Sequence, residues 1–186
     1  MTAAATAHGQ FTITRDYAAA PARVFAAWAD IETKARWFIG PDDWTLLERR
    51  LDLRVGGEEL LHGRFPGSGR ETHFSARYHL VERNARLVYV YDMATRLASR
   101  PALDGPAPVR SGAAARSPAG DDWRHHSVSL ATVEFLPRGG GTTLRFNEQV
   151  VFVDGTASRE GTLSRERGTA AHLDRLGAVI DGATTR

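Results

Sequence analysis

The chain has 186 residues, 42% of them hydrophobic, which is enough for one domain with a substantial core. It has no cysteine, which excludes disulfides, thiolate nucleophiles and cysteine-ligated zinc. The net charge of +2 is too small to predict a general nucleic-acid binder, and no apolar run is long enough to span a membrane. Lys34 is the only lysine among 24 basic residues, a bias typical of a GC-rich bacterial genome.

The N-terminal residues 1–9 have neither a basic region nor an apolar stretch and are therefore not a signal peptide. We expect them to form a disordered tail of a cytoplasmic protein. A single domain is then expected over residues 10–182. Its first strand is predicted at about 10–17, where apolar and polar residues alternate.

Two short helices are predicted after this strand. Pro21 suits the first turn of the first helix, where its missing N–H is not needed. Asp30 is a plausible N-cap for the second helix, and Gly40-Pro41 ends it. Period-2 alternation between glycine clusters then predicts six further strands, at about 44–54, 58–65, 70–82, 86–92, 125–136 and 142–153.

A long C-terminal helix follows these strands, with Ser164 favoured as its secure start and a looser turn before it. Residues at 3.6-residue spacing place one face of this helix toward the sheet: Thr162, Glu166, Thr169, Leu173, Leu176 and Ile180.

The segment 94–124 interrupts the series of strands. It is rich in proline, alanine and arginine, and its only aromatic residue is Trp123. Such a composition offers little to bury, so we expect a mobile insertion that contributes little to stability. A lid over a ligand site is the functional alternative.

The chain resembles the Aha-type branch of the START/SRPBCC superfamily. The resemblance rests on residues 20–28, on Ala35-Arg36-Trp37-Phe38, on Leu53-Arg54-Val55-Gly56-Gly57, on residues 129–135 and on Gly168-Thr169 with residues 173–177. It implies an α+β helix-grip fold, in which a curved antiparallel sheet of about six to seven strands grips the long C-terminal helix. Bacterial members of the branch resemble the C-terminal domain of an activator of a heat-shock chaperone ATPase.

The resemblance implies a cavity between sheet and helix that binds a small apolar or amphipathic molecule. One alternative is an enzyme of the cyclase/aromatase kind, as in polyketide cyclases of the superfamily. Another is a chaperone-associated interaction module. A homodimer is compatible with each of these, and the family offers no shared catalytic motif to carry over.

Glu148 is the most informative polar residue, because it lies in an otherwise apolar strand row where burial would raise its pKa. Glu166 could reach the same cavity from the helix. The tyrosine hydroxyls could orient a ligand and, in an enzyme, move protons. The candidate cavity walls are Trp37, Phe38, Trp44, Phe74, Tyr78, Tyr89, Tyr91, Phe146 and Leu173.

No metal site or cofactor is predicted. His125 and His126 are adjacent in a strand and point to opposite faces, while His73 and His79 are about 20 Å apart along another. Gly139-Gly140-Gly141 joins two antiparallel strands, so we interpret it as a hairpin turn and not a phosphate-binding loop.

Overall fold

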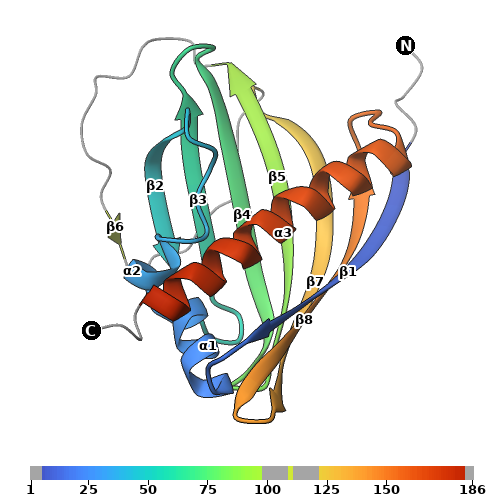
Figure 1. Ribbon diagram of the computed structural model, residues 1–186. Coiled ribbons are helices and arrows are strands. Elements are labelled where there is room, and N and C mark those ends of the chain that lie inside the picture. The colour runs from blue at the N-terminus through green and yellow to red at the C-terminus, as the bar shows by residue number, and fades with distance from the viewer. Residues whose placement is uncertain (1–5, 98–108, 111–121, 183–186) are drawn as a thin grey trace.

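A curved sheet wraps around one long helix in the computed structural model, which describes residues 6–97, 109–110 and 122–182 (Figure 1). The strands are β1 (Ala7–Tyr17), β2 (Thr45–Leu51), β3 (Glu58–Phe65), β4 (Arg70–Glu82), β5 (Arg86–Leu97), β6 (Val109–Arg110), β7 (Arg124–Arg138) and β8 (Gly141–Phe152). The helices are α1 (Pro21–Ala29), α2 (Ile31–Lys34) and α3 (Ser158–Gly182).

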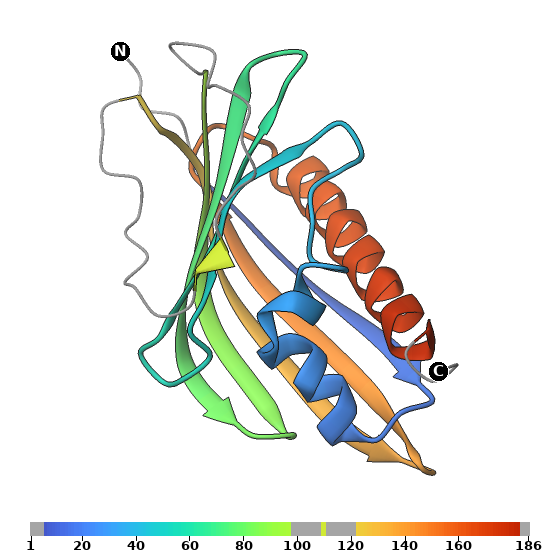
Figure 2. The same cartoon turned by 90° about the vertical axis from the view of Figure 1, so that its left-hand side faces the viewer.

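The strand order is β1-β8-β7-β5-β4-β3-β2-β6, and all neighbouring pairs are antiparallel except the two-residue pairing of β6 with β2. All three helices lie on one face of the sheet, which curves around α3 (Figure 2). This arrangement confirms the predicted helix-grip fold. The face that carries the helices is called the concave face below, and the opposite one the convex face.

Both short helices begin as their sequences predict, but α2 ends at Lys34, before the predicted end at Gly40-Pro41. Pro21 occupies the first turn of α1, and the Asp30 carboxylate accepts a hydrogen bond from the backbone N–H of Thr33 at the start of α2. Trp28 and Trp37 pack with their ring centroids 4.9 Å apart, and the Trp37 indole donates to the Ala27 carbonyl. These contacts join α1 to the segment that follows α2, and the Trp28 ring packs against Phe135 of β7.

Several boundaries differ from the predictions because backbone pairing needs no apolar alternation. β1 begins at Ala7 and pairs there with Phe152, so residues 7–9 belong to the sheet and not to a tail. β5 continues to Leu97, and β7 begins at Arg124. The ends of the expected insertion are therefore strands, while residues 98–108 and 111–121, like residues 1–5, lie outside the described residues.

The C-terminal helix begins at Ser158, six residues before the predicted Ser164. Gly161 allows this early start, since a Cβ there would lie 2.7 Å from the Phe152 ring. The buried residues of α3 are Gly161, Leu173, Leu176, Val179 and Ile180. Its apolar packing is thus concentrated in the C-terminal half.

Candidate functional site

A small cavity lies between the concave face of the sheet and the middle of α3. Its volume is about 50 Å³, room for one or two water molecules and far below the roughly 300–1,000 Å³ of typical small-molecule sites. Its walls are mainly aromatic and include Trp28, Trp37, Phe38, Phe74, Tyr89 and Phe146. The interior is therefore closely packed, and the polar groups around the cavity decide what it can do.

A buried ion pair borders the cavity on the side of α2. The Lys34 ammonium lies 2.6 Å from a Glu59 carboxylate oxygen, and the Tyr78 hydroxyl donates to the same oxygen at 2.5 Å. Three aromatic rings surround the ammonium at 5.1–5.8 Å from their centroids. Burial lowers the pKa of Lys34, and the neighbouring Glu59 opposes that effect.

A second polar group lies on the concave face of β7 and β8. Glu148 is completely buried and accepts a hydrogen bond from the Ser129 hydroxyl at 2.8 Å. Burial raises the pKa of Glu148, and the nearby Arg165, Tyr91 and Ser129 only partly offset this. Its other carboxylate oxygen, Oε2, makes no hydrogen bond of ordinary geometry among the described residues, although the Tyr91 hydroxyl lies close enough to the carboxylate to lower its pKa.

Arg165 connects this group to α3. Its guanidinium donates to the Ser127 hydroxyl at 2.5 Å and to the Tyr91 hydroxyl at 3.2 Å, and it lies 5.5 Å from the centre of the Tyr91 ring. Since Tyr91 also lines the cavity, the Glu148 group and the Lys34–Glu59 pair border the same aromatic interior from two sides.

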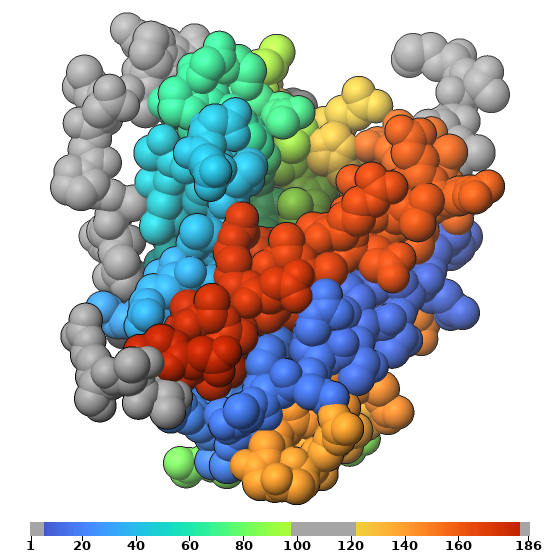
Figure 3. All heavy atoms as spheres, in the orientation of Figure 1, coloured from blue at the N-terminus to red at the C-terminus, as the bar shows by residue number. Residues whose placement is uncertain are grey.

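The surface is hollowed above the middle of α3. Figure 3 shows this hollow between α3 and the light-blue segment that leads into β2, with atoms of the green strands at its floor. Most residues in the N-terminal half of α3 are polar, and few of them are buried. The cavity therefore lies close to an open side of the molecule.

The comparisons with known proteins agree with this architecture. Residues 18–181 match the family described as Activator of Hsp90 ATPase homolog 1-like protein. The chain belongs to this family. A comparison with curated proteins found no match.

Two solved structures show the family likeness at useful identity. An uncharacterized protein from Rhizobium leguminosarum is 32% identical over 95% of this chain and 97% of its own, with a TM-score of 0.73. A protein from Rhizobium loti is 33% identical over 94% and 99%, with a TM-score of 0.69. An AHSA1-like protein from Aeromonas hydrophila, 20% identical over 95% of both chains with a TM-score of 0.61, shares the fold.

In this AHSA1-like chain, most of the predicted wall residues do meet. Those that border the cavity are Trp37, Phe38, Phe74, Tyr89, Tyr91, Phe146 and Leu173. Tyr78 lies behind the cavity, where it bonds to Glu59. Glu148 faces the same interior beside Tyr91.

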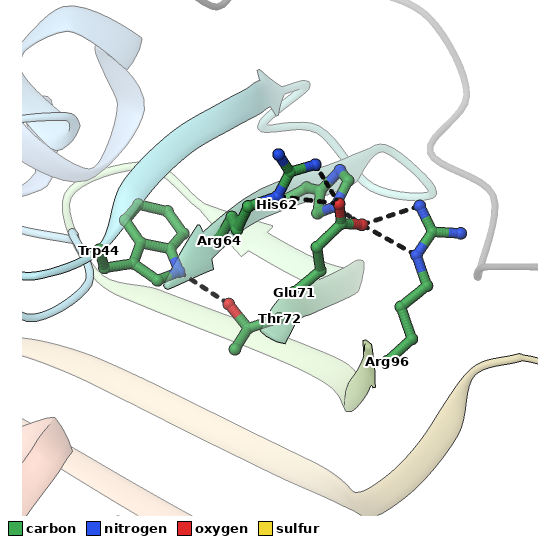
Figure 4. Close-up of polar contacts among 6 residues, drawn as sticks. All are labelled: Trp44, His62, Arg64, Glu71, Thr72 and Arg96. Carbon is green, nitrogen blue, oxygen red and sulfur yellow. Dashed lines mark hydrogen bonds and ion pairs between the residues drawn. The ribbon is translucent and has the colours of Figure 1, made fainter. Parts of the chain in front are cut away.

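Two predicted site residues lie elsewhere. Trp44 packs over Gly63 at the rim of the sheet and donates to the Thr72 hydroxyl at 2.8 Å (Figure 4). Glu166 borders a wide, shallow surface groove beside β1, β7 and β8. Because α3 turns its Arg165 side toward the sheet, the predicted helix face was wrong by one residue at this point.

Sequence reasoning missed Lys34, Glu59 and Arg165. A usable signal existed for Glu59, which alternates in phase with Leu61 along β3 and so faces the core. Lys34 stands out as the only lysine, next to an aromatic segment. Their pairing joins α2 to β3, and no pattern within either element predicts it.

Glu71 lies at the centre of a further polar cluster on the convex face. Its carboxylate accepts hydrogen bonds from His62, Arg64 and Arg96 (Figure 4). Burial alone would raise the pKa of Glu71, but these three partners lower it to about 2. Trp123 lies against His62 and beneath the Arg96 guanidinium. This cluster ties the strand ends together and lies across the sheet from the cavity.

Two negative findings hold within the described residues. No group of three or more histidine or acidic side chains there is arranged to hold a metal ion. None of the described helices combines the length and hydropathy of a membrane span.

Proposed function

We propose that the chain binds a small amphipathic molecule between the sheet and α3. The observation that carries the proposal is the fully buried Glu148 carboxylate, whose Oε2 makes no hydrogen bond of ordinary geometry and lies with Tyr91 and Arg165 beside an aromatic cavity. A buried carboxylate oxygen without a partner is costly, and a ligand hydroxyl or amide could donate to it. The apolar part of the ligand would occupy the aromatic interior.

The cavity must widen to admit such a molecule, because about 50 Å³ holds only water. The structure offers one way to widen it. The N-terminal half of α3 is held mainly by polar contacts such as those of Arg165, whereas Leu173 and Leu176 anchor the C-terminal half. Displacing the first half exposes little apolar surface and is therefore the less costly movement.

A matched pair of variants tests the site. Thr169→Phe fills the cavity from α3, whereas Ser164→Phe places the same ring on an exposed position of the same helix. Native mass spectrometry against fatty acids and aromatic alcohols should identify a binder. We expect Thr169→Phe to weaken its affinity by about tenfold or more and Ser164→Phe to leave it unchanged. Equal affinities for the two variants would place the ligand elsewhere, and no binder at all would contradict the proposal.

An enzyme of the cyclase/aromatase kind is the second candidate, favoured by the gathering of Ser129, Tyr91 and Arg165 around Glu148. A buried carboxyl group with a raised pKa can donate or accept a proton near neutral pH. Glu148→Gln keeps the shape of the side chain but cannot exchange a proton. If the function is catalytic, this variant should bind a poly-β-ketone substrate and fail to turn it over. Unchanged turnover of an identified substrate would exclude an acid/base role for Glu148.

A further inference from the structure

Three side chains form a hydrogen-bonded line. They come from the end of the sheet where β5 ends, β7 begins and β8 leads into α3, an end that the reader can follow in Figure 1. The Thr95 hydroxyl oxygen lies 2.7 Å from His126 Nε2, and His126 Nδ1 lies 2.6 Å from Asp154 Oδ2. A hydroxyl, an imidazole and a carboxylate in this order have the geometry of a nucleophile, its general base and the group that orients the base.

The protons of this line can be assigned from its chemistry. The Asp154 carboxylate accepts the backbone N–H of Thr156 at 3.0 Å through its other oxygen, and its side chain is 11% exposed. Burial opposes ionisation, but these hydrogen bonds outweigh it and hold the pKa of Asp154 well below its usual range. An ionised carboxylate only accepts, so His126 Nδ1 carries a proton, and in the neutral imidazole Nε2 accepts from the Thr95 hydroxyl.

The local fold places the histidine where a substrate can reach it. Met93 pairs with Ser127 and Ala94 with His125, so His126 occupies a bulge in β7. Its side chain is 32% exposed. Thr95 pairs with Thr72, whose hydroxyl bonds to Trp44, so Thr95 lies on the concave face.

We propose that Thr95, His126 and Asp154 form a second site that hydrolyses small acyl esters. Thr95 and His126 are its catalytic residues and Asp154 its positioning residue. The site is separate from the Glu148 group and does not depend on the ligand proposed for the cavity.

The reaction balances with water as the only co-reactant. The Thr95 oxygen bonds to the acyl carbon as its proton passes to His126 Nε2, and that proton then goes to the departing alcohol as the ester C–O bond breaks. Water next attacks the acyl-threonine and gives one proton to His126. The Thr95–acyl bond breaks, the carboxylic acid leaves, and Thr95 recovers its proton.

The test uses p-nitrophenyl acetate with the full chain. Thr95→Val keeps the shape of the side chain but removes the nucleophile, while Thr95→Ser keeps a less hindered hydroxyl. We expect the first variant to fall to the buffer rate, the second to retain or exceed the wild-type rate, and His126→Gln to be inactive. Thr72→Val is the matched control on the neighbouring strand and should leave the rate unchanged. Peptide mapping of the acylated protein should find the acetyl group on Thr95.

The test of Asp154 needs a measurement that a purely structural role of this residue would leave unchanged. Asp154→Asn should reduce the rate by about 100-fold or more and abolish the low-field NMR signal of the His126 Nδ1 proton. That signal should persist in Thr95→Val, which also shows that the variant keeps its fold. A wild-type rate equal to buffer, an unchanged rate in Thr95→Val, or acetylation at another residue would each overturn the proposal.

Discussion

Lys34 and Glu59 approach to 2.6 Å with side chains that are each only 3% exposed. The pair joins α2 to β3 beneath a cage of aromatic rings, with Tyr78 as a third partner. Removing one member of such a pair leaves an uncompensated charge in the core.

We therefore expect Lys34→Met to lower the free energy of unfolding by about 3–5 kcal/mol. The double variant Lys34→Met/Glu59→Leu should be less destabilised than Lys34→Met alone, because neither charge remains buried. Urea denaturation measures both. Arg86→Ala, which breaks the exposed pair with Glu82, is the control and should cost no more than about 1 kcal/mol. A loss for Lys34→Met as small as that of the control would show that the pair contributes little.

The pH dependence of stability should report His73. Burial on the convex face lowers its pKa from 6.5 to about 4, and the nearby His62, His125, Arg96 and Arg50 add to the effect. The unfolded chain therefore binds a proton between pH 6.5 and 4 that the folded chain does not, and the free energy of unfolding falls as the pH drops through this window.

His73→Gln should reduce the pH dependence of the free energy of unfolding in this window, whereas His79→Gln, at an exposed position, should not. Urea midpoints at several pH values between 7.5 and 4 would show the difference. Glu71 affects stability at lower pH. Because its pKa is lowered to about 2, its contribution to the free energy of unfolding is lost only as the pH falls from about 4.5 to 2. Identical pH profiles for the two histidine variants would mean that His73 charges freely in the folded protein.

Two glycines of α3 should respond oppositely to alanine. A Cβ at Gly161 would lie 2.7 Å from the Phe152 ring, whereas at Gly168 nothing lies within 4 Å. We expect Gly161→Ala to lose about 1–3 kcal/mol through overpacking and Gly168→Ala to gain about 1 kcal/mol through helix propensity. Thermal unfolding of the two single variants compares them directly. A stabilised Gly161→Ala would show that α3 can move away from β8 at little cost.

Two deletions should distinguish the contribution of the strand ends to thermal stability from that of the segment between them. Joining Met93 to His125 removes Ala94, which is fully buried, together with Trp123 and its ring contacts. We expect the thermal midpoint to fall by about 10 °C or more. Joining Leu97 to Asp122 through a short glycine-containing turn keeps these residues and should shift the midpoint by only a few degrees. Equal losses in both would show that residues 98–121 are needed for stability.

Sequence pattern predicted seven of the eight strands in the described residues but not the arrangement of the site. Alternation predicted β3 and β4 with the bounds that the structure shows, because each strand has one face toward the core. The 3.6-residue spacing of the helix placed Glu166 toward the cavity, whereas Arg165 is the residue that bonds to the sheet. The close contact of Gly161 with Phe152 lies outside that spacing.

The buried charges were harder to predict for a physical reason. A lysine in a four-residue helix and a glutamate in a strand each look like surface residues, and only the packing of α2 on β3 makes them partners. The cavity volume is likewise set by how the aromatic side chains interlock, which the order of residues along the chain does not determine.

The burial of Lys34 also makes the native surface chemically unusual. As the chain has no other lysine, its folded form offers no side-chain amine to acylating or cross-linking reagents. Those reagents can reach Lys34 only when the cage around it opens. Labelling of Lys34 with an amine-reactive reagent therefore reports opening of the core, read as a mass increment on the peptide that contains Lys34, apart from any label on the N-terminal amine.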